Sequence, residues 1–456
     1  MNTQLVDLSR LQFALTVAFH MLFPSITVGL SVLLVVLYGT YLKTKQHIYL
    51  IMYRFWRNIF AVGFGLGIVA GIVITFEFGL NWAGYANAVG PIVGVIISME
   101  VITAFFLEAG FLGIMLYGEG RVGQRTIFVA NCMVALGTLL STTWILSANS
   151  WMQTPAGYAE INGQFRPTNW LAAIFNPSFF YRYPHMLLGV LLSAAFLVTG
   201  IAAWYLLKRR HLEFARRTFS LGLGVIAILV PLQLFAGDSV AFAMESYQPP
   251  KMLAAEGNWN STNTGDFLFI ITDQQDQRNI VEIGVPLMGS IIWSHDFTFT
   301  KPVPGLQTVP LSLQPPMMFV FYGFHLMVYL GVLMFFVGFL SLLLRLRGQL
   351  YTARWFQRLA LLMTPAGLVA IIGGWMTAET GRQPWVVYGK LLTNTAVSPL
   401  SPGVVIASLI GFIATYAALF TIYIVYLVRA VRKGPEAVPA LTPPPEGSPE
   451  ARVPAS

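Results

Sequence analysis

Four side chains that can bind a metal or carry a proton stand inside stretches that are otherwise apolar: His20, His185, His325 and Glu379. An ionisable side chain inside a lipid bilayer is costly and is usually functional. Each histidine alone could simply hydrogen-bond a neighbouring helix. Three of them together with several carboxylates favour a cofactor site or a proton path.

Glu379 lies in the most concentrated of these stretches, Gly373–Trp385. It ends a long apolar run and is followed by Arg382, with Trp375 and Trp385 on either side. A carboxylate at the end of a membrane-spanning helix needs a partner. We therefore expect this stretch to form part of a functional site.

A histidine and a methionine suggest one specific kind of site. Met327 lies in the apolar sequence Phe324–Val328, and His185 follows a proline at the start of another apolar run. A lone methionine in an apolar helix is ordinarily core filler. If it faces a histidine, the two can form the axial pair of a low-spin haem. The residues alone leave both interpretations open.

Glu100 and Glu108 belong to one apolar run. Eight residues of α-helix correspond to ~12 Å of rise and roughly 80° of rotation. The two carboxylates are therefore predicted to lie along one broad side of a helix, as in a proton relay. The alternative is two independent hydrogen bonds to neighbouring helices. A third acid, Glu77, is expected at the membrane interface.

The polar stretch Glu245–Gly257 joins Lys251 and Glu256 to an aromatic residue, Tyr247. It directly follows an apolar run and is expected near the outer membrane surface. It could be a solvated loop or a binding site at the level of the lipid headgroups.

The composition indicates an all-α membrane protein. Of 456 residues, 56% are hydrophobic and 10% are charged, whereas a soluble protein carries about 25% charged residues. About 20 apolar residues cross a bilayer, and nine such segments are predicted: 12–41, 57–79, 91–118, 125–148, 184–207, 217–236, 317–344, 359–378 and 403–429. The single cysteine, Cys132, excludes disulfides and thiolate metal sites within the chain.

Basic residues predict how these segments are oriented. Most Lys and Arg side chains fall in alternate loops and in the C-terminal tail, so the positive-inside rule places the N-terminus outside and the C-terminus in the cytoplasm. The net charge of +8 is explained in this way and does not indicate nucleic-acid binding. We expect a membrane domain over 1–433 with a large outer loop at 237–316, and a disordered tail over 434–456.

Several motifs follow one another along nearly the whole chain before the tail. They are Ser9-Arg10-Leu11-Gln12-Phe13-Ala14-Leu15 leading to His20, the segment Glu100–Glu108, Ser147–Gly157, Gln248-Pro249-Pro250-Lys251 with Glu256-Gly257, and Gly381-Arg382-Gln383-Pro384-Trp385. On these motifs the chain resembles subunit I of the cytochrome bd-type quinol oxidases, and its quinol-oxidising loop resembles that of the short-loop members.

The resemblance implies three haems near the outer face of the membrane. His185 and Met327 match the axial ligands of a low-spin haem b. His20 and Glu379 match the ligands of a high-spin haem b and of haem d, and which ligand serves which haem stays open. Some short-loop members lack a clear haem d spectrum, so the third haem could also be a haem b.

Other matched residues surround these haems. Arg10 and Arg382 match partners of haem propionates, which suits the geometry of a guanidinium and a carboxylate. Trp375 is expected to pack around the same macrocycles. Lys251 and Glu256 match residues of the quinol-oxidising loop.

The activity implied is that of a terminal quinol oxidase in a prokaryotic cell membrane. Quinol is oxidised at the outer face, and oxygen is reduced to water at the high-spin pair with protons supplied through Glu108 and Glu100. Charge separation generates proton motive force without pumping. The implied partners are a haem-free membrane subunit II, small accessory subunits, ubiquinol or menaquinol, and oxygen.

Two residues depart from the family pattern. His325 stands two positions before Met327, where arginine is usual, and could be a rival ligand. Glu77 stands where glutamine is usual. Two other functions are alternatives: a haem-containing quinol electron shuttle without oxygen reduction, and a proton-coupled transporter that uses Glu100, Glu108 and Glu379.

Overall fold

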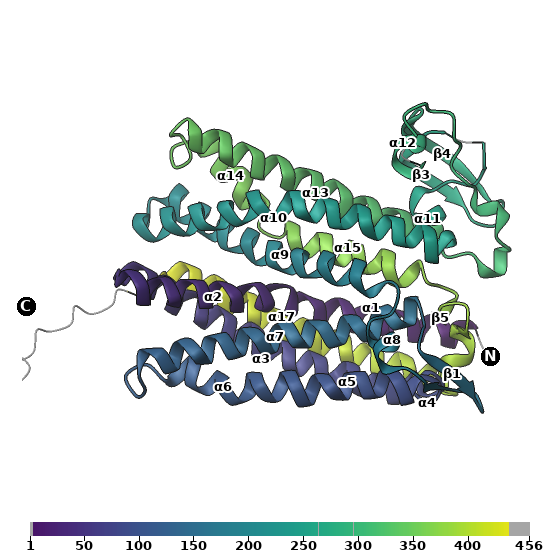
Figure 1. The fold of residues 1–456 in the computed structure, drawn as a ribbon, viewed down its shortest axis with the longest axis horizontal. Coiled ribbons are helices and arrows are strands. Elements are labelled where there is room, and N and C mark those ends of the chain that lie inside the picture. Colours follow the sequence, from purple (N-terminus) through teal and green to yellow (C-terminus); the bar gives the residue numbers. More distant parts are fainter. Residues whose placement is uncertain (1–2, 263, 295, 437–456) are drawn as a thin grey trace, which may run out of the picture.

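The chain forms a bundle of long helices that run roughly parallel to one another (Figure 1). The computed structural model describes residues 3–262, 264–294 and 296–436. Within these residues nine stretches of helix are long and apolar enough to cross a membrane, which confirms the predicted number. They are α1 (Thr3–Leu22) with α2 (Pro24–Thr44), α3 (His47–Leu80), the composite span Ala83–Tyr117, α7 (Gln124–Gln153), α9 (Phe179–Lys208), α10 (Leu212–Tyr247), α13 (Met317–Leu346), α14 (Arg354–Leu362) with α15 (Ala366–Thr380), and α17 (Pro402–Lys433).

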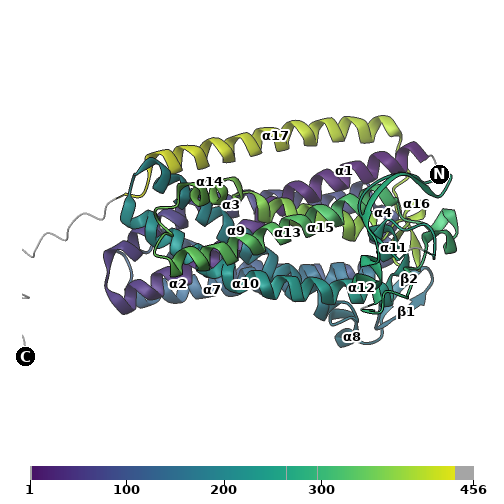
Figure 2. The same ribbon diagram turned by 90° about the horizontal axis from the view of Figure 1, so that it is seen from above.

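The main apolar core joins α2, α3, α9 and α10. Trp56, Tyr53, Phe60, Phe196 and Phe219 are completely buried there. Figure 2 shows α17 along one edge of the bundle, beside α1. Many large apolar side chains on α13 and α17 remain exposed within this single chain, as expected of helices that face lipid or another subunit.

Prolines interrupt the helices close to several candidate site residues. Pro24 separates α1 from α2, because its ring lacks an N–H and crowds the carbonyl four residues earlier, that of His20. The His20 carbonyl instead accepts from the Phe23 N–H at 3.2 Å. Pro184 and Pro231 lie inside α9 and α10.

The third span differs from the continuous helix predicted over 91–118. It consists of α4 (Ala83–Val89), η1 (Gly90–Gly94), α5 (Val95–Glu100), η2 (Val101–Phe105) and α6 (Phe106–Tyr117), in which η1 and η2 are π-helical. π-helical turns are rare and occur mostly at functional sites. The segment η2 lies between Glu100 and Glu108, so the rotation predicted for an ideal α-helix does not apply to this pair.

The end of the bundle that carries the N-terminus also carries small hairpins, and we call it the outer end after the predicted orientation (Figure 1). Three antiparallel pairs lie there: β1 (Tyr158–Ile161) with β2 (Gln164–Pro167), β3 (Asp266–Asp273) with β4 (Arg278–Val285), and β5 (Trp385–Val387) with β6 (Leu391–Leu392). The β3–β4 register pairs Asp266 with Val285. The short helices are α8 (Trp170–Ile174), α11 (Pro249–Glu256), α12 (Met288–Ser294), η3 (Leu306–Thr308), η4 (Leu311–Leu313) and α16 (Thr393–Ala396).

The large outer loop is shorter than predicted and has its own core. Because α10 continues to Tyr247, the connection to α13 covers 248–316 and not 237–316. Trp259, Ile270 and Leu306 pack there against Met317 and Phe321 at the start of α13. Of the tail predicted over 434–456, residues 437–456 lie outside the described residues.

Candidate functional site

Glu379 ends α15 in a hydrogen-bond network at the outer end of the bundle. Its Oε1 accepts from Asn149 Nδ2 at 2.9 Å and from Gln153 Nε2 at 3.3 Å. Its Oε2 forms an ion pair with Arg382, which is nearly completely buried. Donors from two elements therefore fix the orientation of this carboxylate.

Lys251 of α11 joins the same network. Its side chain is 2% exposed, and its Nζ lies 2.5 Å from Gln153 Oε1 and 2.8 Å from Gln248 Oε1. Burial holds the pKa of Lys251 well below its usual range, and the nearby arginines lower it further. Gln153 thus connects the helix of the outer loop with Glu379.

Two arginines and Lys251 surround the Glu379 carboxylate. Besides Lys251 and Arg382, Arg182 of α9 takes part through Asn149, whose Oδ1 accepts from Arg182 Nη2 at 2.7 Å. This arrangement leaves an excess of positive charge that suits further anionic groups. Arg10 lies at the same end but donates to Gln383 Oε1 at 2.8 Å.

Three of the candidate haem ligands pack against glycines of facing helices. A Cβ at Gly71 would lie 3.2 Å from His20 Cε1, and one at Gly237 would lie 3.3 Å from His185 Cε1. A Cβ at Gly374 would lie 2.8 Å from the sulfur of Met327.

The surroundings of these ligands suit a flat macrocycle. The buried Nδ1 of His20 has no hydrogen-bond partner in the described part of the chain, whereas Gln233 Nε2 lies 3.1 Å from His185 Nδ1 and orients that ring. Side-chain-free helix surfaces beside histidine, methionine and carboxylate donors fit haem. Trp375 of α15 packs nearby toward α9, in a cluster with Met21 and Ile371.

Glu100 and Glu108 both face α7. Ser141 Oγ donates to Glu100 Oε1 at 2.8 Å. One turn away, a Cβ at Gly137 would overlap Glu108 Cγ. Asn149 of the same helix donates to Glu379. All three carboxylates, Glu100, Glu108 and Glu379, therefore contact α7.

Glu256 does not face Lys251. Five residues of helix turn the two side chains roughly 140° apart, and Glu256 lies beside Asp266 of β3 instead. It is 4% exposed, and its Oε1 has no hydrogen-bond partner in the described ranges. Burial first, and then the Asp266 carboxyl, raise the pKa of Glu256 to about 8.

The imidazole ring of His325 contacts the backbone of the outer loop. Its Nε2 lies 2.8 Å from the Phe267 carbonyl of β3, and its Nδ1 lies 3.0 Å from the Phe321 carbonyl. The ring stacks on Phe321 at 3.8 Å between centroids. Both ring nitrogens therefore lie within hydrogen-bond distance of backbone oxygens, and the nitrogen that carries the proton donates.

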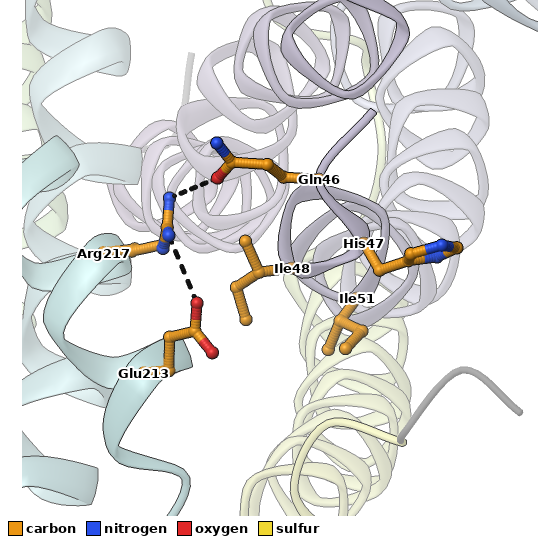
Figure 3. Close-up of a pocket in the computed structure, with 6 residues that line it drawn as sticks. All are labelled: Gln46, His47, Ile48, Ile51, Glu213 and Arg217. Carbon is orange, nitrogen blue, oxygen red and sulfur yellow. Dashed lines mark hydrogen bonds and ion pairs between the residues drawn. The ribbon is translucent and has the colours of Figure 1, made fainter. Parts of the chain in front are cut away.

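An open cavity of about 500 Å³ lies at the opposite end of the bundle (Figure 3). Arg217 bridges it, with Gln46 Oε1 at 2.9 Å and Glu213 Oε1 at 3.2 Å. None of the candidate site residues lines this cavity.

Several residues that build the site had no role predicted from the sequence: Asn149, Gln153, Arg182, Gln248 and Asp266. Asn149 and Gln153 are one helical turn apart at the end of an apolar run, and this spacing was the signal that could have identified them. Asp266 lies ten residues along the chain from Glu256, in a hairpin that no pattern predicted.

The chain is similar to known proteins over almost its full length. Residues 8–435 match the family model described as cytochrome bd terminal oxidase subunit I. A cytochrome bd ubiquinol oxidase subunit 1 of Bacillus subtilis is 32% identical over 94% of each chain. A cytochrome bd-II ubiquinol oxidase subunit 1 of Escherichia coli is 33% identical over 96% of this chain and 98% of the relative. The solved bd oxidase of Geobacillus thermodenitrificans has a chain that matches with a TM-score of 0.87 and 29% identity, over 95% of this chain and 100% of that one.

Proposed function

The chain belongs to the cytochrome bd terminal oxidase subunit I family, and from this premise we propose how its residues divide the work of a quinol oxidase. It is a multi-pass protein of the prokaryotic cytoplasmic membrane that binds haem and acts with a partner subunit on quinol and oxygen. The transporter alternative is therefore set aside.

We propose that quinol binds at the outer end, between α11 and the β3–β4 hairpin. Glu256, buried and with one unpartnered oxygen, accepts a proton from the quinol hydroxyl. Lys251 lies on another side of α11 and positions that helix through Gln153. The network from Lys251 through Gln153 to Glu379 is the observation that carries this proposal, because it joins the quinol helix to a candidate haem ligand.

His185 and Met327 would hold the low-spin haem b. His20 and Glu379 would hold the high-spin haem b and the third haem, either d or b. Bound haem supplies the one-electron transfers and the reduction of oxygen. Arg182, Arg382 and Lys251 give their end of the bundle the positive charge that propionates need.

Proton supply is assigned to the carboxylates on α7. Glu108 receives protons from the cytoplasmic side and Glu100 passes them toward the oxygen site, with Ser141 holding Glu100 in place. Quinol protons leave on the outer side. Separation of the two reactions across the membrane generates proton motive force without pumping.

A reduced-minus-oxidised visible spectrum of the purified complex tests this assignment. We expect low-spin and high-spin b-type bands, and a red-shifted band if the third haem is d. His185→Ala should remove the low-spin band, and His20→Ala a high-spin band. A protein without haem bands would contradict the proposal, as would a low-spin band that survives His185→Ala. Ile228→Ala, at an exposed position of α10, is the matched control.

A further inference from the structure

Glu77 of α3 is a buried carboxyl that the proposed reaction does not use. Its side chain is 0% exposed and lies near the end of α3, and its position at the membrane interface stays a prediction. Neither carboxylate oxygen has a hydrogen-bond partner among the residues that the structure describes. The Thr16 hydroxyl lies beside the carboxyl but donates to the Gln12 carbonyl at 3.0 Å, so an ionised Glu77 would be costly. Whether Glu77 carries a proton is therefore sensitive to any charge that enters nearby at low dielectric.

Other buried polar side chains continue outward from Glu77. Ser9, Gln12 and Thr16 of α1 are each 0% exposed, and their spacing of three and four residues puts them on one face of the helix. Ser9 Oγ and Gln12 Nε2 lack partners within the described ranges. Gln12 Oε1 accepts from Ser408 of α17 at 2.9 Å, which fixes the two helices together.

Thr16 and Tyr416 complete the group around the carboxyl. The Thr16 hydroxyl lies beside Glu77 and beside Tyr416 of α17. The Tyr416 hydroxyl also has no hydrogen-bond partner in the described part of the chain. We call Ser9, Gln12, Thr16, Glu77 and Tyr416 the polar stripe. Buried polar groups in proteins are normally satisfied, so this concentration of unpartnered atoms is typical of a route for protons and water.

The polar stripe leads toward His20. His20 lies one turn beyond Thr16 on α1, about 6 Å along the axis. Its ring packs against Gly71 of α3, and Glu77 lies further outward on the same helix. Of the titratable side chains, Tyr416 of α17 faces Glu77, whereas His20 lies one turn further along α1 than Thr16.

We propose that Glu77 binds one proton when an electron reaches the haem that His20 would hold, and releases it on reoxidation. This inference rests on the ligand assignment in the proposed function. An electron that enters a buried site adds negative charge at low dielectric, and a proton on a nearby carboxylate neutralises that charge. The electron comes from quinol, and the proton comes from the outer aqueous phase along Ser9, Gln12 and Thr16. One electron and one proton are taken up together, so the charge balances.

The decisive variant is Glu77→Gln, which is nearly isosteric and cannot ionise. The midpoint potential of the haem band that depends on His20 is measured at several pH values, together with redox-difference infrared spectra of the carboxyl region. In the unaltered complex the potential falls as pH rises. In Glu77→Gln we expect a weaker pH dependence, a higher potential at alkaline pH and the loss of one protonated-carboxyl band.

Two further variants test the inference: one alters the neighbour of Glu77, and the other is a control. Tyr416→Phe retains the carboxyl but removes the facing hydroxyl, so the same infrared band should shift in frequency. Glu282→Gln, in the outer hairpin, should leave both measurements unchanged. An unaltered pH dependence and an unaltered carboxyl band in Glu77→Gln, or an unshifted band in Tyr416→Phe, overturn the inference. A high-spin band that survives His20→Ala instead overturns the ligand assignment, and the inference with it.

Discussion

Glu100 and Glu108 lie against consecutive turns of α7, at Ser141 and Gly137. In a continuous α-helix eight residues would rotate them roughly 80° apart. The π-helical segment η2 lies between them, and each residue of a π-helix turns less about the axis than an α-helical one. The π segment therefore turns both carboxylates toward the same neighbour. This arrangement favours a relay over two unrelated helix contacts.

Gly137→Ala tests whether the position of Glu108 matters. The added methyl would overlap Glu108 Cγ and the nearby Ala104 backbone, so it should cost about 1–3 kcal/mol of stability and displace the carboxylate. We expect slower oxygen reduction while quinol still reduces the haems, measured by oxygen uptake and by stopped-flow spectra. Gly113→Ala, which has open space around it, is the control. Unchanged oxygen uptake in Gly137→Ala would argue against a relay through Glu108.

Met327→Leu tests whether Met327 is a haem ligand or only packs as an apolar core residue. The exchange conserves volume and should cost less than about 1.5 kcal/mol, yet it removes the only sulfur donor at this position. The low-spin band should disappear from the visible spectrum, while the high-spin bands remain. Met334→Leu, in the core on the same helix, should leave the spectrum intact.

His325→Gln checks the rival ligand. Because both ring nitrogens of His325 lie on backbone carbonyls, the low-spin band should survive this substitution. We expect the β3–β4 hairpin to be loosened instead, which faster limited proteolysis of the outer loop would show. Loss of the low-spin band in His325→Gln, together with its survival in Met327→Leu, would make His325 the ligand.

The sequence predicted the spans and the ligand candidates because both depend on local patterns. Apolar length alone fixes nine spans, and a histidine within such a span is conspicuous. The network around Glu379 could not be predicted, since Lys251 and Gln153 meet only after α7 and α11 are packed. The π segments and the burial of Glu77 were missed for the same reason. They depend on how α1, α3, α7 and α17 contact one another. Contacts between helices that are distant in the sequence cannot be predicted from a local pattern of residue types.

Gln153→Ala tests the link between the quinol helix and Glu379. It removes one of the two acceptors of the buried Lys251 amine and one donor to Glu379. An unsatisfied buried partner costs about 1–3 kcal/mol, which corresponds to a roughly fivefold to 140-fold weaker interaction. We expect a higher KM for quinol with a smaller change in kcat. Gln153→Glu keeps an acceptor for Lys251 but replaces the donor to Glu379 by a second carboxylate, so it should not rescue the loss. Gln164→Ala, at a half-buried position of β2 outside this network, should behave like the unaltered protein. An unchanged KM in Gln153→Ala would show that the contact between α11 and Glu379 does not affect quinol binding.

The pH dependence of quinol oxidation tests Glu256 as the proton acceptor. Burial and Asp266 raise its pKa to about 8, so Glu256 is protonated, and unable to accept a proton, at lower pH. The rate should therefore rise with pH toward about 8 and level off above it. Asp266→Asn removes the neighbouring carboxylate and lowers the pKa of Glu256, so the acidic limb should move to lower pH. Asp276→Asn, at the exposed turn of the same hairpin, should not move it. If Glu256→Gln retains the same acidic limb, the proton acceptor is another group.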